Sequence, residues 1–255
     1  MTALLSIRGL TMGYGGEPIL DGLDLDIRAG EFVTLVGPSG SGKTSILRAI
    51  TGLSPLQRGT VSLDVPLGDV GFLFQDDALL PWRTARQNAA LGMRVRGVAR
   101  ATAEQKADEW LASMGLRLFG GRYPRQLSGG QRKRVALAQV LSLEPKLLLM
   151  DEPFASLDAI VRMRITDELL HWVERRHLTV LLVTHDLEEA LALSDVVYVL
   201  SRGPRAAVRA RYSVPIPRPR HAIAARGHEA FGPMLQRLWE DLAEPEMEPA
   251  QEPRQ

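Results

Sequence analysis

A glycine-rich segment of eight residues is the feature that most constrains how this chain can fold. Residues 37–44 form the sequence GPSGSGKT, which satisfies G-x-x-x-x-G-K-[ST] between an apolar stretch and a helical pattern. Glycines let backbone N–H groups converge on phosphate oxygens, and the positive end of the following helix dipole adds to the attraction. The segment therefore predicts a phosphate-binding loop at a strand-to-helix junction. A glycine-rich turn before an ordinary helix is the alternative interpretation.

Every residue of this loop is a candidate nucleotide ligand. Lys43 is expected at the β- and γ-phosphates, and the Thr44 hydroxyl is expected to coordinate Mg²⁺. The predicted nucleotide-binding residues are Gly37, Pro38, Ser39, Gly40, Ser41, Gly42, Lys43 and Thr44.

Short apolar stretches alternate with helical patterns along the chain, which predicts an α/β fold with a mainly parallel sheet and helices on both faces. Strands are expected at 4–10, 32–36, 60–63, 71–74, 147–150, 180–183 and 196–200. Helices are expected at 45–52, 159–175 and 187–193. A further helical block from about residue 84 to 140 is too long for a crossover, so we expect an inserted α-helical subdomain there.

Composition narrows the class of protein. The 31 lysines and arginines and the 30 aspartates and glutamates leave a net charge of +1, which excludes a strong general attraction to nucleic acid. The absence of cysteine excludes disulfides, thiol chemistry and cysteine-based zinc sites. No run of about 18 apolar residues is present, and the start MTALLSIRGL lacks a signal-peptide pattern. We therefore expect a cytosolic chain without a membrane span.

Two acidic residues follow the apolar stretch 147–150. A buried strand would deliver Asp151 and Glu152 to its C-terminal end, where ligands bind in open α/β sheets. Asp151 suits the Mg²⁺ shell, and Glu152 can polarise an attacking water. A strand that ends in a solvated acidic turn is the alternative, and the phosphate-binding loop upstream favours the catalytic interpretation.

A second candidate anion site lies at LSGGQ, residues 127–131, immediately before another helical pattern. A serine and two glycines at a helix start present backbone N–H groups to an anion by the same physics as the first loop. One chain does not need two such sites for one nucleotide, which suggests that this segment completes the pocket of another copy. An ordinary helix cap, with Ser128 as the N-cap residue, is the alternative.

With these three segments in this order, the chain resembles the nucleotide-binding (ATPase) subunits of ABC transporters over about residues 4–210. LSGGQ is the signature of that family. The resemblance implies an ATP- and Mg²⁺-dependent ATPase with a P-loop NTPase core, built on the mainly parallel sheet. It also implies an N-terminal antiparallel β-subdomain and places the signature in the inserted helical subdomain.

The resemblance implies roles for further residues. Tyr14 matches the aromatic residue that stacks on adenine, and Gln75 matches the glutamine that senses Mg²⁺ and the attacking water. His185 matches the histidine that contacts the γ-phosphate, and residues 156–158 (SLD) match a loop that crosses the dimer interface. Taken singly, Tyr14 could be a strand-end aromatic residue, Gln75 a surface amide and His185 a helix-capping or exposed histidine.

The family also implies a homodimer. Two copies are expected to pack head to tail, with each ATP between Lys43 of one copy and the signature of the other. The residues expected to bind ATP across the interface are Ser128, Gly129, Gly130, Gln131 and Asp158.

A finer resemblance lies in residues 75–84, QDDALLPWRT, which are similar to the subgroup that serves nitrate, sulfonate, taurine or bicarbonate importers. It implies the energising ATPase of an importer for a small anion, at the cytoplasmic face of the inner membrane. Its expected partners are integral membrane permease subunits and, indirectly, an extracytoplasmic solute-binding protein. Leu79, Leu80 and Trp82 are candidate permease contacts. The alternative is that Trp82 packs inside its own subdomain.

A soluble ABC ATPase in DNA repair or translation is the alternative function. Repair members carry long coiled coils or zinc-binding cysteines and translation-linked members carry tandem cassettes, and neither feature is present in this sequence. Glu152 and His185 argue against a regulatory module without ATPase chemistry.

We expect the ATPase domain to span residues 1–212, with a C-terminal extension at 213–255 whose last fifteen residues form a solvated, disordered tail. The sequence departs from the family pattern at two places. Gln139 stands where arginine is usual, and a hairpin expected over residues 60–74 is short.

Overall fold

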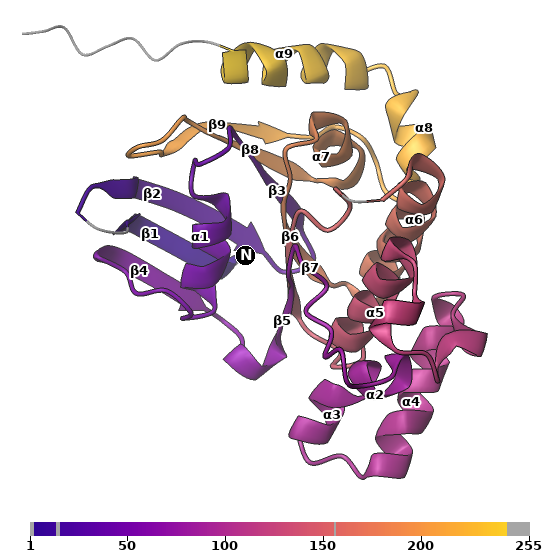
Figure 1. Ribbon diagram of the computed structural model, residues 1–255. Helices are drawn as coiled ribbons and strands as arrows, with labels where there is room; N and C mark the ends of the chain where they lie inside the picture. Colours follow the sequence, from indigo (N-terminus) through magenta and orange to yellow (C-terminus); the bar gives the residue numbers. More distant parts are fainter. Residues whose placement is uncertain (1–2, 14–15, 156, 244–255) are drawn as a thin grey trace, which may run out of the picture.

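Two β-sheets enclose the helix that follows the glycine-rich loop (Figure 1). The computed structural model describes residues 3–13, 16–155 and 157–243. A three-stranded antiparallel sheet has the order β2 (Pro18–Arg28), β1 (Ala3–Gly13) and β4 (Arg58–Leu63). A six-stranded sheet has the order β5 (Val70–Leu73), β6 (Leu147–Asp151), β7 (Thr179–Val183), β3 (Phe32–Val36), β8 (Val196–Leu200) and β9 (Val208–Ser213).

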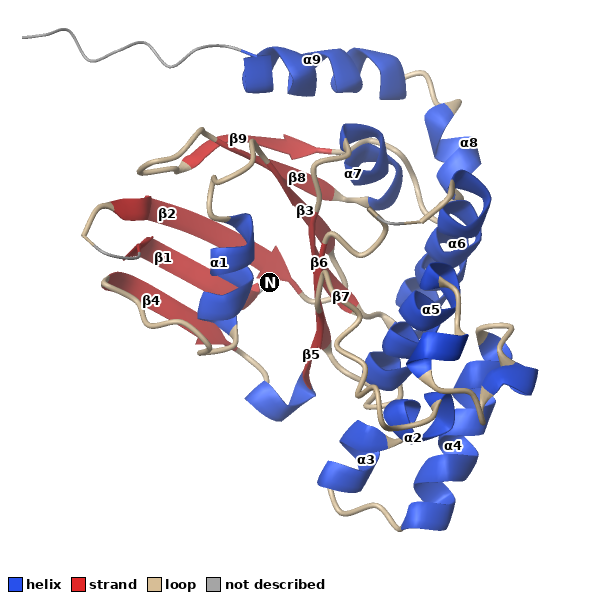
Figure 2. Cartoon of the chain, in the orientation of Figure 1, coloured by secondary structure: helices blue, strands red, loops and turns tan. Residues whose placement is uncertain are grey.

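Helices cover both faces of the six-stranded sheet (Figure 2). The α-helices are α1 (Lys43–Ile50), α2 (Ala85–Ala89), α3 (Leu91–Val95), α4 (Arg100–Ser113), α5 (Gly129–Leu141), α6 (Ala159–Arg176), α7 (Leu187–Leu193), α8 (Ala222–Arg226) and α9 (Phe231–Ala243). Short 3₁₀ turns lie at η1 (Leu67–Asp69), η2 (Arg117–Phe119) and η3 (Pro124–Gln126). Helix α1 packs between the two sheets, because its buried residues share one hydrophobic cluster with both.

The central strands are mostly apolar because both faces of the sheet are covered. Every residue of β3, β6, β7 and β8 is buried. Strands β5, β6, β7, β3 and β8 pair in parallel, and only β9 is antiparallel. This arrangement confirms the predicted mainly parallel sheet with helices on both faces, and the antiparallel β-subdomain is present as the second sheet.

The expected hairpin over residues 60–74 is wrong. Strand β4 pairs with β1 in the antiparallel sheet, whereas β5 pairs with β6 in the other sheet, so residues 64–69 connect two sheets. Gly71 lies where α5 packs against β5 in the large sheet. A Cβ on Gly71 would lie 2.6 Å from a Val140 methyl carbon of α5, so only glycine allows this close packing of helix on strand.

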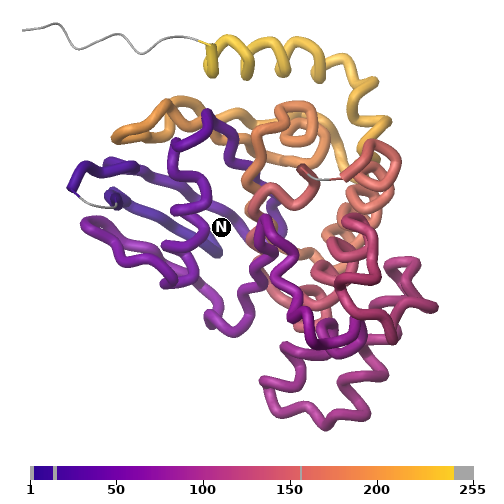
Figure 3. Tube along the Cα trace, in the orientation of Figure 1, coloured from indigo at the N-terminus to yellow at the C-terminus, as the bar shows by residue number. Residues whose placement is uncertain are grey.

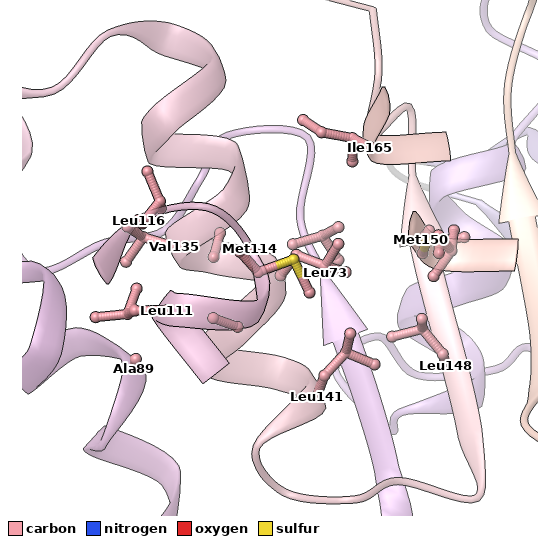
Figure 4. Packing of buried hydrophobic residues seen from close by; sticks show 14 of the residues in the cluster. Leu73, Ala89, Leu111, Met114, Leu116, Val135, Leu141, Leu148, Met150 and Ile165 are labelled. Carbon is pink, nitrogen blue, oxygen red and sulfur yellow. The ribbon is translucent and has the colours of Figure 1, made fainter. Parts of the chain in front are cut away.

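The helical block is divided into four short helices and two 3₁₀ turns around one apolar cluster, shown in Figure 4. Asn88 in α2 is fully buried and fixes the preceding loop. Its side-chain amide donates to the carbonyl oxygens of Leu80, Arg83 and Thr84, and its Oδ1 accepts from the Leu80 N–H at 2.8 Å. The loop that contains Trp82 is therefore tied to the subdomain by backbone groups.

The C-terminal segment is part of the fold. The loop before β9 returns to the N-terminal sheet through a bridge between Leu20 and Ala206, along the path traced in Figure 3. Arg220 is 6% exposed, donates to the Ile216 carbonyl and forms an ion pair with Asp195 at 2.9 Å. Helix α9 packs through Leu238 and its apolar neighbours in one cluster with α7 and β8.

The expectation of a solvated, disordered tail over residues 241–255 is wrong for residues 241–243, which belong to α9. Asp241 lies in α9 and accepts a hydrogen bond from the Tyr212 hydroxyl at 2.6 Å. The rest of the expected disordered end, residues 244–255, lies outside the described residues. Within the ranges 3–13, 16–155 and 157–243, no helix combines the length and apolar character needed to cross a membrane.

The packing of α9 can be tested with two neighbouring residues. Leu238→Ala should lower the free energy of unfolding by about 2–5 kcal/mol, because it leaves a cavity in a closed cluster. Trp239, which is 60% exposed on the same helix, is the control, and Trp239→Ala should change it by about 0.5 kcal/mol or less. Urea unfolding of both variants measures the difference. If Leu238→Ala lowers the free energy of unfolding by no more than about 0.5 kcal/mol, as expected for the control, α9 does not contribute to the core.

Candidate active site

The parallel strands bring four loops to one edge of the six-stranded sheet. Parallel pairing of β5, β6, β7 and β3 places the carboxyl ends of these strands together. The residues that follow them are Gln75, Asp151 with Glu152, His185, and the glycine-rich loop 37–44. All of these residues were expected from the sequence to act at one site.

The glycine-rich loop adopts the backbone that its glycines permit. Gly40 and Gly42 have φ angles of 82° and 83°, in the left-handed region. A Cβ on Gly37 would lie 3.0 Å from the Leu200 Cβ, and a Cβ on Gly42 would lie 2.8 Å from the Leu20 side chain. The loop is therefore enclosed by β8 and β2 and can follow this path only with glycine at these positions.

Lys43 is 7% exposed and is held by the loop that precedes it. Its Nζ donates to the carbonyl oxygens of Gly37 and Pro38, both at 2.8 Å. Burial lowers the pKa of Lys43, and the charges of Glu152 and Asp151 oppose that shift. Because these hydrogen bonds go to neutral carbonyls, the positive charge stays available to an anion such as a phosphate.

Asp151 and Thr44 form the second element of the site. The Thr44 hydroxyl donates to Asp151 Oδ1 at 3.1 Å, and Asp151 is 4% exposed. Burial raises the pKa of Asp151, the Thr44 hydrogen bond opposes that shift, and the charge of Glu152 adds to it. A cation at this position would relieve the burial of the carboxylate. The described residues contain no group of three His, Cys, Asp or Glu side chains that could hold a metal ion.

Glu152 and His185 form the third element. Glu152 Oε2 lies 3.2 Å from His185 Nδ1, and the two side chains are 23% and 64% exposed. The φ angle of Glu152 is 42°, a conformation that costs energy in a residue with a side chain, and its N–H donates to the Val183 carbonyl at 2.9 Å. The turn directs the Glu152 carboxylate toward His185, where it can accept a proton from a water molecule.

Gln75 is exposed, and its backbone is held by a buried lysine that sequence analysis missed. Lys133 in α5 is 2% exposed, donates to the Gln75 carbonyl at 2.9 Å and forms an ion pair with Asp77 at 3.1 Å. Arg132 lies 3.3 Å from Asp77 as well. A lysine on the apolar face of a predicted helix, with Leu137 four residues later, is the signal that could have revealed this contact.

The signature residues form a helix cap. Ser128 Oγ accepts from the Gln131 N–H at 3.3 Å, and Gln131 Oε1 accepts from the Ser128 N–H at 2.9 Å, as in a capping box. A Cβ on Gly130 would lie 2.8 Å from a Val161 methyl carbon of α6. Asp158 caps α6 beside it by accepting from the Val161 N–H at 3.0 Å. Across the described ranges, no hydrogen bond or ion pair joins residues 128–131 to the glycine-rich loop.

Two residues expected from the sequence cannot be placed. Tyr14 and Ser156 lie outside the described residues. The loop 79–82, in contrast, is described, and the exposure of Trp82 tests whether this residue packs inside its own subdomain. Trp82 is 70% exposed, so the interpretation that it packs inside its own subdomain is wrong, whereas Leu79 is half-buried and packs against the apolar cluster.

Comparison with known proteins agrees with this geometry. A family model described as ABC transporter matches residues 20–155. The chain is 42% identical to an aliphatic sulfonates import ATP-binding protein of Pseudomonas fluorescens, over 98% of this chain and 91% of that protein. It is 40% identical to a taurine import ATP-binding protein of Escherichia coli O157:H7, over 79% of this chain and 81% of that protein.

A solved structure supports the same relationship. A dimeric bacterial ABC transporter cassette superposes with a TM-score of 0.74 and 30% sequence identity, covering 84% of this chain and 100% of that chain. The family model and these relatives together show that the chain belongs to the ABC transporter family, whose ATP-binding proteins of import systems are ATPases.

Proposed function

We propose that this chain is the ATP-hydrolysing subunit that energises a membrane importer for a small anion of the nitrate, sulfonate or taurine type. The observation that supports it most directly is the pair of contacts at one sheet edge, Thr44 with Asp151 and Glu152 with His185. The names of the relatives, import proteins for aliphatic sulfonates and for taurine, support the class of solute. They give no support to the alternative of a soluble ATPase in DNA repair or translation.

The proposed reaction uses residues in distinct roles. The loop 37–44 binds the ATP phosphates. Thr44, Asp151 and Gln75 would hold Mg²⁺, which would neutralise charge on the phosphates. Glu152 accepts a proton from water as the water oxygen bonds to the γ-phosphorus. The bond from that phosphorus to the β,γ-bridging oxygen breaks, giving ADP and phosphate. His185 contacts the γ-phosphate and orients Glu152, and Tyr14 is the proposed adenine contact.

The role of Glu152 is tested by Glu152→Gln. Hydrolysis should fall by about 10²-fold or more while ATP affinity is kept, because only the proton-accepting carboxylate is lost. Glu144→Gln is the matched control, since Glu144 lies near the opposite end of β6 with an exposed side chain, and it should hydrolyse ATP normally. Steady-state phosphate release and equilibrium ATP binding are measured. Normal hydrolysis by Glu152→Gln would show that another group is the base.

We infer that the functional unit is a homodimer with shared sites. The Ser128 and Gly130 backbone groups begin a helix whose dipole can bind an anion, yet no described contact joins them to the loop 37–44 of the same chain. In a head-to-tail dimer, Ser128 and Gly130 of one copy complete the nucleotide site at the loop 37–44 of the other copy. Gly129, Gln131 and Asp158 lie beside them and contribute to the same site. The dimeric state of the solved cassette supports this inference.

Mixed dimers test the shared site. Lys43→Ala should weaken ATP binding, because a phosphate-facing charge disappears. Ser128→Arg should keep ATP binding but block closure over the γ-phosphate of the partner. A mixed dimer of these two variants contains one intact composite site, so phosphate release should appear in the mixture and be absent from each variant alone. Ser113→Arg, at an exposed serine of α4, is the control and should remain active. Normal hydrolysis by Ser128→Arg alone would contradict the shared site.

We infer that the loop around Trp82 receives the permease. Trp82 is an exposed indole on a loop whose backbone is fixed by the buried Asn88, so it is presented without a large loss of loop entropy. Leu79 and Leu80, both half-buried, precede Trp82 in the same loop and are the other candidate contacts. The subunit would thus act at the cytoplasmic face of the inner membrane, coupled through the permease to an extracytoplasmic solute-binding protein.

Trp82→Ala separates docking from folding. It should leave the melting temperature and ATP affinity unchanged, because the side chain is mostly exposed, and should weaken permease binding by about 2 kcal/mol. Trp239→Ala, at an exposed tryptophan of α9, is the control for loss of an indole. Co-purification with the permease and thermal unfolding of the isolated subunit are compared. Unaltered co-purification by Trp82→Ala would refute the docking role.

A further inference from the structure

The turn between β8 and β9, residues 201–207, packs against the glycine-rich loop. A Cβ on Gly203 of this turn would lie 2.9 Å from the Gly40 carbonyl oxygen and 3.7 Å from the Gly40 carbonyl carbon. The oxygen is the nearer atom, so the Gly40 carbonyl is directed at Gly203. The φ angle of Gly203 lies outside the left-handed region, so this contact, and not the backbone conformation, excludes a side chain at residue 203.

The direction of the Gly40 carbonyl fixes the direction of a neighbouring N–H donor. The peptide bond between Gly40 and Ser41 is trans and planar, so its N–H points away from its C=O. The Ser41 N–H therefore points into the loop, where it donates to the Pro38 carbonyl at 3.3 Å. The Lys43 Nζ donates to the same carbonyl at 2.8 Å, so the Ser41 N–H and the lysine charge converge on one place inside the loop.

The β8–β9 turn is held in place at its base and at its tip. At the base, the Ser201 N–H donates to the Ala207 carbonyl at 3.0 Å, and Ser201 Oγ accepts from the Ala207 N–H at 3.1 Å. At the tip, the Arg205 N–H donates to the Pro18 carbonyl of β2 at 2.9 Å, and the Arg205 side chain forms an ion pair with Asp21 at 2.5 Å. The turn is thus joined to the N-terminal sheet, as its path in Figure 3 shows.

We propose that Gly203 is a positioning residue for ATP binding, which lets the β8–β9 turn contact the Gly40 carbonyl and so aims the Ser41 N–H at the phosphates. This inference rests on the proposed role of the loop 37–44 in binding the ATP phosphates. Gly203 itself does not touch the nucleotide. It acts through the plane of the peptide between Gly40 and Ser41.

A methyl group at residue 203 would disturb this arrangement. A Cβ does not approach a backbone oxygen to 2.9 Å without a shift, so either the turn or the Gly40–Ser41 peptide must move. The turn is anchored at both ends, whereas the peptide lies between two left-handed glycines, Gly40 and Gly42, and rotates more easily. Rotation of that peptide turns the Ser41 N–H away from the loop interior, which removes one hydrogen bond to a charged phosphate.

The experiment uses the full chain and measures KM for ATP, kcat, the dissociation constant of MgATP and the melting temperature. Gly203→Ala adds the methyl group. Gly68→Ala is the matched control, because a Cβ on Gly68 would meet no atom within 4 Å and this residue precedes β5 at the opposite end of the strand from Gln75. Leu238→Ala is the second control, because it destabilises the fold from α9 without adding a group near the loop.

We expect Gly203→Ala to raise KM for ATP and the dissociation constant of MgATP by about tenfold, with kcat changed by less than about twofold. Both controls should bind MgATP as wild type does, although Leu238→Ala melts at a lower temperature. A merely structural role for Gly203 would lower the melting temperature in the same way and leave the affinity for MgATP unchanged.

Two further variants test the anchor of the turn and decide the question if Gly203→Ala does not fold. Arg205→Ala and Asp21→Asn each remove the ion pair between the turn and β2, whose side chains are 64% and 32% exposed, so folding should be kept. Each variant should raise KM for ATP by about threefold, because the turn then holds the Gly40 carbonyl less firmly. An effect of Arg205→Ala without one of Asp21→Asn would show that the arginine binds the nucleotide directly.

Contrary results are clear in each case. An affinity of Gly203→Ala for MgATP equal to that of wild type would overturn the proposal, whatever happens to the melting temperature. If Gly203→Ala does not fold, unchanged affinity in Arg205→Ala or in Asp21→Asn overturns it instead. Lys43→Ala is measured beside them. Unchanged affinity in Lys43→Ala would refute phosphate binding by the loop 37–44, whereas lost affinity there with normal affinity in Gly203→Ala would refute the role of Gly203 alone.

Discussion

The parallel pairing of β6, β7 and β3 is the constraint on which the active site depends. The ladder continues past the ends of the strands, where the Glu152 N–H donates to the Val183 carbonyl at 2.9 Å and the Thr184 N–H donates to the Leu35 carbonyl at 3.2 Å. The turns that carry Glu152 and His185 are therefore registered to each other and to the glycine-rich loop by backbone hydrogen bonds. A shift of β6 would break the Glu152–His185 contact and the Thr44–Asp151 contact together, because both carboxylates lie at its end.

A second link joins the proposed permease surface to the signature helix. The buried Lys133 binds Asp77 and the Gln75 carbonyl, and Arg132 also pairs with Asp77, so α5 and the loop after β5 are joined by charged contacts. Removing Asp77 would leave the Lys133 charge buried without its ion-pair partner, which favours movement of the loop and the helix as one body. Since Ser128 caps the same helix, a displacement at the loop that precedes Trp82 has a direct mechanical path to the signature.

Apolar runs and the glycine-rich loop were sufficient to predict the central strands and the edge of the sheet where the site lies, because both depend on local pattern. The partner strand of β4 was not predictable in this way, because the residue pattern in 58–63 indicates a strand without indicating which sheet it joins. Strand β2, with its many aspartates, and strand β9, with its arginines, lack an apolar run because they lie at sheet edges. Lys133 was missed for another reason, because a buried charge is recognised by its tertiary partners.

Adjacent Asp151 and Glu152 show how one strand end can supply two different carboxylates. Asp151 is the last residue of β6, is almost fully buried and is tied to the Thr44 hydroxyl, an environment that suits a fixed charge beside a cation. Glu152 has left the strand through a positive φ angle, carries one more methylene group and is partly exposed beside His185. A proton acceptor must reach water and release the proton again, and only the second environment allows this. The proposed division of labour therefore follows from the turn at the end of the strand, because the turn moves one carboxylate out of the sheet and leaves the other inside it.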